Sequence, residues 1–111
     1  MSHGLFHNML TRYGFHEVSN RYYPSPTRMC VKEDICVIRY NDMYDCGILG
    51  KDIDGNFYIK STLISTRKKI RRNTLAIDID TMKTLLKKSK NYFDLTRRVN
   101  NYLVTVALET L

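Results

Sequence analysis

A run of β-forming residues that begins at Met29 constrains the fold of this 111-residue chain more than any other feature. Valine, isoleucine and tyrosine are frequent in it, and side chains 35–40 alternate in type as they do along a strand. A second strand is expected over residues 44–51 and a third over residues 56–63, separated by a turn whose Asp-Gly pair is a strong hairpin signal. Residues 31–60 are therefore predicted to form a three-stranded antiparallel meander.

The segments on both sides of the meander predict a short helix and a further strand. Apolar residues recur at helical spacing over residues 2–14, where Ser2 can cap the start and Gly14 can end the helix in a left-handed conformation. A connector with two prolines follows, because proline removes backbone donors and restricts its neighbours to extended conformations. A fourth strand is expected either over residues 62–70 or over residues 75–79.

The C-terminal part of the chain predicts helices. Asp80 is expected to cap the first helix, and Asp94 can cap another. The pattern leaves open whether residues 89–91 separate two helices or lie within one long helix. The apolar side chains expected to face the core in either case are Met82, Leu85, Leu86, Phe93, Val99, Leu103 and Val106. The predicted fold class is α+β in a single domain over residues 1–111, with an N-terminal helix (1–14), a β region (29–79) and a region of one or two helices (80–110).

Part of the β region is similar to a known family of small barrels. The matching pieces are a charged turn at Glu33-Asp34, an apolar strand from Ile35 to Tyr40, Asp42 to Tyr44, Gly47-Ile48-Leu49, the Asp54-Gly55 turn and the strand from Phe57 to Ile59. With these pieces residues 31–60 resemble the central strands of an SH3-like or Tudor-type barrel. The resemblance implies a closed small barrel and a binding module for peptide or nucleic acid. In the Tudor branch aromatic rings form a cage for methylated lysine or arginine, and Tyr40, Tyr44 and Tyr58 are the available rings; ordinary cross-strand tyrosines are the alternative.

The positive charge is concentrated in one third of the chain. The sequence has 18 lysines and arginines against 11 acidic residues, a formal net charge of +7. Residues 60–98 contain twelve basic and three acidic residues, so this segment carries +9 and the rest of the chain carries −2. Such a field favours polyanions, of which nucleic acid is the commonest in cells. The alternative is a surface that only keeps the protein in solution.

The densest basic run is residues 67–72, with five cations in six positions and hydroxyl and amide side chains on both sides. It is predicted to contact phosphate groups together with the basic face of residues 83–98; a solvated loop or a nuclear-targeting run is the alternative. The candidate nucleic-acid-binding residues are Arg67, Lys68, Lys69, Arg71, Arg72, Lys83, Lys87, Lys88, Lys90, Arg97 and Arg98. Tyr92 and Phe93 could stack on unpaired bases, although Phe93 also continues the apolar stripe.

Metal and catalytic sites find little support in the sequence. His3 and His7 are four residues apart, but neither these histidines nor the three cysteines complete a zinc-ligand pattern. The Asp52-x-Asp54-Gly55-Asn56 segment lacks the later acidic ligands of a calcium loop and is explained by a turn. No nucleophile elbow or glycine-rich phosphate loop is present. We therefore expect no metal, no cofactor and no enzymatic activity.

The chain is expected to work inside the cell. Three cysteines without framework spacing are typical of free, buried thiols in a reducing compartment. No apolar run approaches the length of a membrane span, and the first residues do not resemble a secretory signal. The predicted location is cytoplasmic, in the host cell if the protein is viral, and no membrane contact is expected.

The sequence is compatible with two functions. The first is a small, non-catalytic, regulatory protein that binds DNA or RNA. The alternative is a viral or phage accessory protein that binds an acidic protein surface and inhibits or adapts a larger host complex. Residues 102–111 carry apolar side chains around more than half of a helix, which predicts a homodimer formed through the C-terminal helix.

Overall fold

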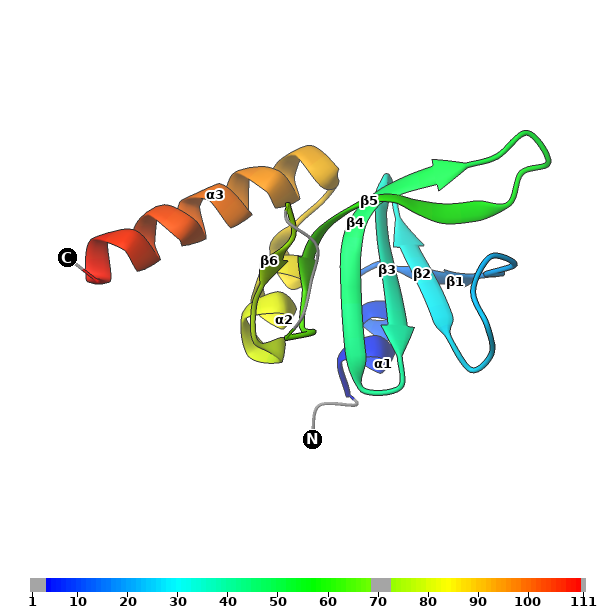
Figure 1. Cartoon of the computed structure of the whole chain (residues 1–111), viewed down its shortest axis with the longest axis horizontal. Helices are drawn as coiled ribbons and strands as arrows, with labels where there is room; N and C mark the ends of the chain where they lie inside the picture. The colour runs from blue at the N-terminus through cyan, green and yellow to red at the C-terminus, as the bar shows by residue number, and fades with distance from the viewer. Residues whose placement is uncertain (1–3, 69–72, 111) are drawn as a thin grey trace.

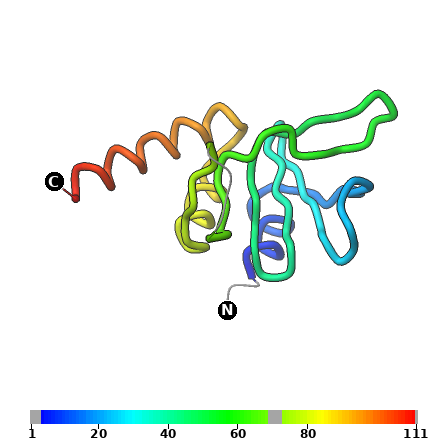
Figure 2. The backbone as a smooth tube through the Cα atoms, in the orientation of Figure 1, coloured from blue at the N-terminus to red at the C-terminus, as the bar shows by residue number. Residues whose placement is uncertain are grey.

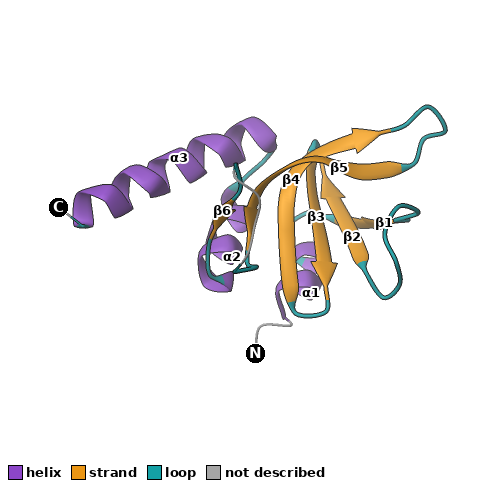
Figure 3. Ribbon diagram, viewed as in Figure 1, coloured by secondary structure: helices purple, strands orange, loops and turns teal. Residues whose placement is uncertain are grey.

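The computed structural model describes residues 4–68 and 73–110 and has an α+β fold. In chain order the elements are α1 (Gly4–Thr11), β1 (His16–Val18), β2 (Arg28–Lys32), β3 (Ile35–Tyr40), β4 (Met43–Lys51), β5 (Phe57–Ser65), β6 (Leu75–Ala76), α2 (Ile79–Lys88) and α3 (Tyr92–Glu109). The expected fold class is confirmed: an N-terminal helix, a central β region and, of the two alternatives, two C-terminal helices (Figure 3).

The six strands form one open, mixed sheet in the order β1-β2-β3-β4-β5-β6. Strands β1 to β5 are antiparallel neighbours, whereas β6 pairs in parallel with the end of β5, Ile64 opposite Leu75 and Ser65 opposite Ala76. Strands β1 and β6 are therefore the two edges of the sheet as described. Closure of the meander into an SH3-like barrel is not confirmed.

The β region has more strands than the sequence pattern predicted. The run that begins at Met29 reverses at Glu33, whose φ of 52° is left-handed, and so forms the two strands β2 and β3. The third predicted strand becomes β5, which continues to Ser65, and β6 lies in the second of the two ranges expected for a fourth strand. The short strand β1 was missed, because three residues are too few to show an alternating pattern.

The helix boundaries also differ from the expected ones. The N-terminal helix is shorter than predicted and ends at Thr11, although Gly14 has the left-handed φ of 86° that was expected of it; Ser2 lies outside the described residues. Asp78, not Asp80, caps α2, since its Oδ1 atom accepts a hydrogen bond from the Thr81 N–H at 2.7 Å. Because the cap lies two residues before the expected one, α2 begins at Ile79.

The break between α2 and α3 is made by capping side chains. The Ser89 hydroxyl donates to the Leu85 carbonyl at 2.7 Å at the end of α2. Asn91, not Asp94, caps α3: the Asn91 Oδ1 atom accepts from the Asp94 N–H at 2.8 Å, and Asp94 in turn accepts from the Lys90 N–H at 3.0 Å. These reciprocal bonds satisfy backbone donors that a continuous helix would have satisfied internally.

The three helices pack on one face of the sheet, α3 mainly through its first half, and the end of α3 extends beyond the other elements (Figure 1). The main core joins side chains of α1, α2 and α3 to those of the central strands; it includes Leu5, Phe6, Met9, Val37, Cys46, Ile64, Met82, Leu86, Leu95 and Val99. A smaller cluster of Met29, Cys36 and Ile38 lies on the opposite face. The three cysteines are free and buried, as the sequence predicted.

The apolar stripe predicted for the C-terminal helices is only partly correct. Met82, Leu86 and Val99 are buried, but Phe93 is 76% exposed and Leu103 is 41% exposed. The stripe assumed that one helical phase continues past residues 89–91. Because the break resets the phase, α3 buries Leu95 and Val99 and turns Phe93 outward.

Candidate nucleic-acid interface

The candidate basic residues lie in two places. Arg67 and Lys68 follow β5, while Lys83, Lys87 and Lys88 lie on α2, Lys90 lies in the connection, and Arg97 and Arg98 lie on α3. Lys69, Arg71 and Arg72 lie outside the described residues, so the structure tests only part of the basic run.

The α2 lysines project from a helix whose opposite side is anchored in the core. Met82, Leu85 and Leu86 are buried. With 100° between successive residues, Lys83 and Lys87 share one side of α2, whereas Lys88 points toward α3. All three are exposed, as is Lys90, and among the described residues no carboxylate pairs with any of them. Their charge is therefore available to an external anion.

The α3 arginines share one carboxylate. Arg97 Nη2 lies 2.5 Å from Asp94 Oδ1, and Arg98 Nε lies 3.4 Å from the same oxygen. The Lys90 N–H and the two arginines lower the pKa of Asp94, the Lys90 hydrogen bond most. The longer contact is an ion pair rather than a hydrogen bond, and the buried Arg98 Nε has no hydrogen-bond acceptor in the described structure. The Asp94 carboxylate thus forms ion pairs with both arginines and restrains their side chains.

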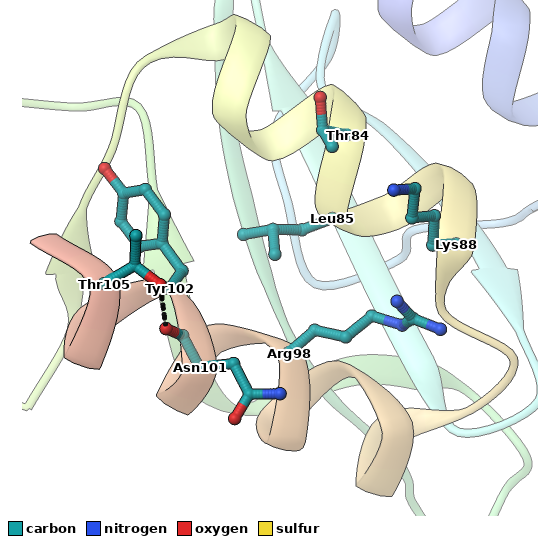
Figure 4. A pocket seen from close by; sticks show the side chains of 7 residues that line it. All are labelled: Thr84, Leu85, Lys88, Arg98, Asn101, Tyr102 and Thr105. Carbon is teal, nitrogen blue, oxygen red and sulfur yellow. Dashed lines mark hydrogen bonds between the residues drawn. The ribbon is translucent and has the colours of Figure 1, made fainter.

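A pocket of about 240 Å³ lies between α2 and α3. Thr84, Leu85 and Lys88 line it from α2, and Arg98, Asn101, Tyr102 and Thr105 line it from α3. Figure 4 shows the Lys88 side chain and the Arg98 guanidinium at the same end of the pocket, with Tyr102 and Thr105 at the other end. Two cations beside hydroxyl and amide groups are the side-chain set that contacts phosphate oxygens.

Sequence reasoning missed the polar partners in this pocket. Thr84, Asn101 and Thr105 carry no charge and were not among the candidates. A signal did exist: Thr84 is four residues before Lys88, and Asn101 is three residues after Arg98, so each pair shares a helix face.

Arg67 has a partner inside the protein. Its Nη2 and Nε atoms donate to the Oδ2 and Oδ1 atoms of Asp45 at 2.7 Å and 3.1 Å. Its guanidinium carbon lies 5.5 Å from the centre of the Tyr40 ring. The side chain that the sequence predicted as the first phosphate contact of the basic run therefore holds the end of β5 to β4, while the next residue, Lys68, is exposed.

The three tyrosines of the predicted aromatic cage do not come together. Tyr44 belongs to the main core, where its hydroxyl accepts a hydrogen bond from the Phe6 N–H at 3.3 Å. Tyr40 packs against the cluster on the opposite face of the sheet. Tyr58 lies edge-on against Tyr22, with 5.8 Å between the ring centres. Rings on opposite faces of one sheet cannot enclose a single methylated side chain.

The remaining motifs have structural explanations. Asp52 accepts hydrogen bonds from the Asp54 and Asn56 N–H groups at 2.9 Å and 2.8 Å, and Tyr22 donates to it as well. The Tyr22 bond and then these backbone bonds lower the pKa of Asp52 to about 2. His3 lies outside the described residues, and within those residues no three histidine, cysteine or acidic side chains gather as metal ligands do.

Comparisons with protein-family models, with curated proteins and with solved structures found no match to this chain. None of the helices that the structure describes is long and apolar enough to span a bilayer. The chemistry of the surface itself therefore carries the functional assignment.

Proposed function

We propose that this chain is a small, non-catalytic nucleic-acid-binding protein. The site is the basic surface of α2 and α3, formed by Lys83, Lys87, Lys88, Lys90, Arg97 and Arg98, together with the basic run that follows β5. The observation that carries the proposal is that the four lysines are exposed and have no carboxylate partner among the described residues. Neutralising phosphates with such side chains releases the counterions condensed on the nucleic acid, which is a large source of affinity.

The pocket between the helices supports a specific place for one phosphate group. Lys88 supplies a mobile point charge, and Arg98 supplies planar donors whose orientation Asp94 restrains. Asn101 lines the same pocket, and its side-chain amide offers neutral donors, whereas the Thr84 hydroxyl donates to the Asp80 carbonyl at 3.1 Å. A phosphate bound there would receive hydrogen bonds from both helices and would fix the register of the backbone on the surface.

The proposed binding is weakly specific for sequence. Lysines on a helix surface contact phosphates, which are the same along every sequence, whereas base reading needs side chains that enter a groove in defined positions. The shared chemistry of the ligand is a phosphodiester backbone, in DNA or in RNA. The free, buried cysteines support a reducing compartment for this activity.

The proposal is tested by measuring fluorescence anisotropy of labelled duplex DNA, duplex RNA and single strands at low salt. The Lys83→Gln/Lys87→Gln/Lys88→Gln variant is expected to lose about tenfold or more in affinity for its preferred nucleic acid. The matched control Arg12→Gln/Arg21→Gln/Lys51→Gln removes three exposed charges elsewhere and is expected to change affinity about twofold at most.

Two results would contradict the proposal. Equal losses in the two triple variants would mean that net charge alone, and not this surface, attracts the nucleic acid. No binding of the unaltered protein to any nucleic acid at low salt would favour the other function, capture of an acidic protein surface by the same lysines.

A further inference from the structure

The exposed apolar side chains of this protein are concentrated on one helix. Among the described residues seven large apolar or aromatic side chains are exposed, and four of them lie on α3. Their exposed fractions are 76% for Phe93, 41% for Leu103, 59% for Val104 and 66% for Leu108. Scattered exposed apolar residues are ordinary, but a set of four on one element marks a contact surface.

The helical spacing places most of these side chains on the side of α3 that faces away from the core. Leu95 and Val99 are buried against the body of the protein. At 100° per residue, Phe93, Val104 and Leu108 lie within about 60° of one another, and the centre of this group is more than 120° from the buried side. The helix therefore has a second side with exposed apolar side chains, which the rest of the protein does not cover. Arg97 lies on this side too, near Phe93.

The second half of α3 also lacks the charges that a solvated helix carries. Residues 99–108 contain no acidic or basic side chain. Figures 1 and 2 show the end of α3 extending beyond the other elements, so that little of the chain's own fold packs against it. The outer side of this half carries Val104 and Leu108 beside Asn100 and Asn101, so it is uncharged and partly apolar.

The accessible surface of the chain is larger than its mass requires. It measures 7246 Å². A compact monomer of 13.1 kDa is expected to expose about 6,400 Å². The excess of about 850 Å² belongs to the whole chain and not to α3 alone, and it is as large as the roughly 800 Å² that each partner buries in a stable interface of standard size.

We infer that α3 pairs with α3 of a second copy of this chain in a symmetric dimer. A two-fold interface uses the same patch on both copies, so the patch must be complementary to itself. The second half of this side, which is uncharged and carries Val104 and Leu108, meets that requirement, whereas two copies of the lysine surface of α2 would repel each other. The interface meets the proposed phosphate surface at Arg97, which lies about 40° around the helix from Phe93 and is on the same side as Val104 and Leu108. The inference holds whether or not the protein binds nucleic acid.

The distribution of charge selects an antiparallel arrangement of the two helices. Arg97, Arg98 and the α2 lysines lie beside the first half of α3, and the second half is uncharged up to Glu109. Parallel pairing would bring the two basic ends together, at a net charge of +7 per copy. Antiparallel pairing keeps these ends apart and places Leu108 of each copy against Phe93 of the other.

Light scattering or sedimentation of the nuclease-treated full chain at micromolar concentration tests the dimer. The expected mass is twice the 13.1 kDa of one chain. The Val104→Glu/Leu108→Glu variant is expected to be monomeric with an unchanged circular dichroism spectrum, since both side chains are exposed. Ile53→Glu, which replaces an exposed apolar residue away from α3, is the matched control and should remain dimeric. A monomeric unaltered chain, or a double variant that is still dimeric, would overturn the inference.

The orientation is tested with a short bifunctional thiol reagent. Leu108→Cys alone is expected to give no cross-linked dimer, because the two substituted positions lie at opposite ends of an antiparallel pair. Phe93→Cys/Leu108→Cys is expected to cross-link readily, and the native cysteines are buried away from the reagent. Efficient cross-linking of Leu108→Cys alone would show parallel helices instead.

Discussion

Asp45 and Arg67, 22 residues apart in sequence, form a two-point ion pair at the edge of the core, with Nη2–Oδ2 and Nε–Oδ1 distances of 2.7 Å and 3.1 Å. The Asp45 side chain is only 3% exposed, and Ser65 Oγ donates a further hydrogen bond to it at 2.5 Å. The pair joins β4 to the end of β5. It therefore fixes the point at which the basic run leaves the sheet.

Replacing Arg67 by alanine is expected to destabilise the protein by about 1–3 kcal/mol. The change leaves a buried carboxylate without its cation, and the cost stays below that of a fully buried pair because the Arg67 side chain is 40% exposed. Lys68→Ala, at the exposed neighbouring position, is expected to change stability by less than about 0.5 kcal/mol. Urea unfolding measures both, and equal midpoints for the two variants would mean that the ion pair adds nothing.

Gly47 allows β4 and β5 to approach each other closely. A Cβ atom at this position would lie 1.9 Å from the Ser61 carbonyl oxygen and 2.8 Å from the Ser61 carbonyl carbon, both backbone atoms. Gly47→Ala is therefore expected to cost about 2 kcal/mol or more, because the strand itself must shift. Gly4→Ala, where the nearest atom is the end of a side chain at 4.0 Å, should be neutral or stabilising in the same unfolding assay. A stable Gly47→Ala protein would show that the two strands pair differently.

The buried cysteines predict a loss of stability at alkaline pH. Burial raises the pKa of Cys36 to about 12 and also raises the pKa values of Cys30 and Cys46, whereas thiols of the unfolded chain ionise near 9.0. Above pH 9.0 the unfolded state therefore binds fewer protons than the folded state, and the free energy of unfolding falls as the pH rises toward the folded pKa values. Each thiol lowers the free energy of unfolding by at most about 1.4 kcal/mol for each pH unit above 9.0.

Unfolding measured one unit below and one unit above pH 9.0 tests this expectation. Cys36→Ala removes one of the three thiols, so its stability should fall less steeply with pH than that of the unaltered chain. The same slope in both proteins would mean that the Cys36 thiol ionises in the folded state.

Local signals in the sequence predicted much of the fold. The alternation of residues 35–40 and the Asp54-Gly55 turn each involve neighbouring residues, and both appear where they were expected, in β3 and in the hairpin of β4 and β5. Helix ends were harder to predict, because several acidic and amide side chains compete to cap the same helix. Asp78 and Asn91 cap the helices in place of the neighbouring residues Asp80 and Asp94.

The candidate site depended more on contacts between distant residues. The sequence identified the lysines of α2 from their spacing alone. It did not predict that Asp45 would bind Arg67, because the two meet only through the pairing of β4 with β5. Nor did it predict the pocket shared by Lys88 and Arg98, since the angle between α2 and α3 is set by tertiary packing.

The central claim, that α2 and α3 present lysines to phosphate groups, is tested most directly by the salt dependence of nucleic-acid binding. If about six phosphates are contacted, the logarithm of the binding constant should fall with the logarithm of the salt concentration with a slope near −5. The Lys83→Gln/Lys87→Gln/Lys88→Gln variant should have a slope less steep by about 2 to 3, and the Arg12→Gln/Arg21→Gln/Lys51→Gln control should keep the original slope. A slope near zero for the unaltered protein, or an unchanged slope in the α2 variant, would contradict the account.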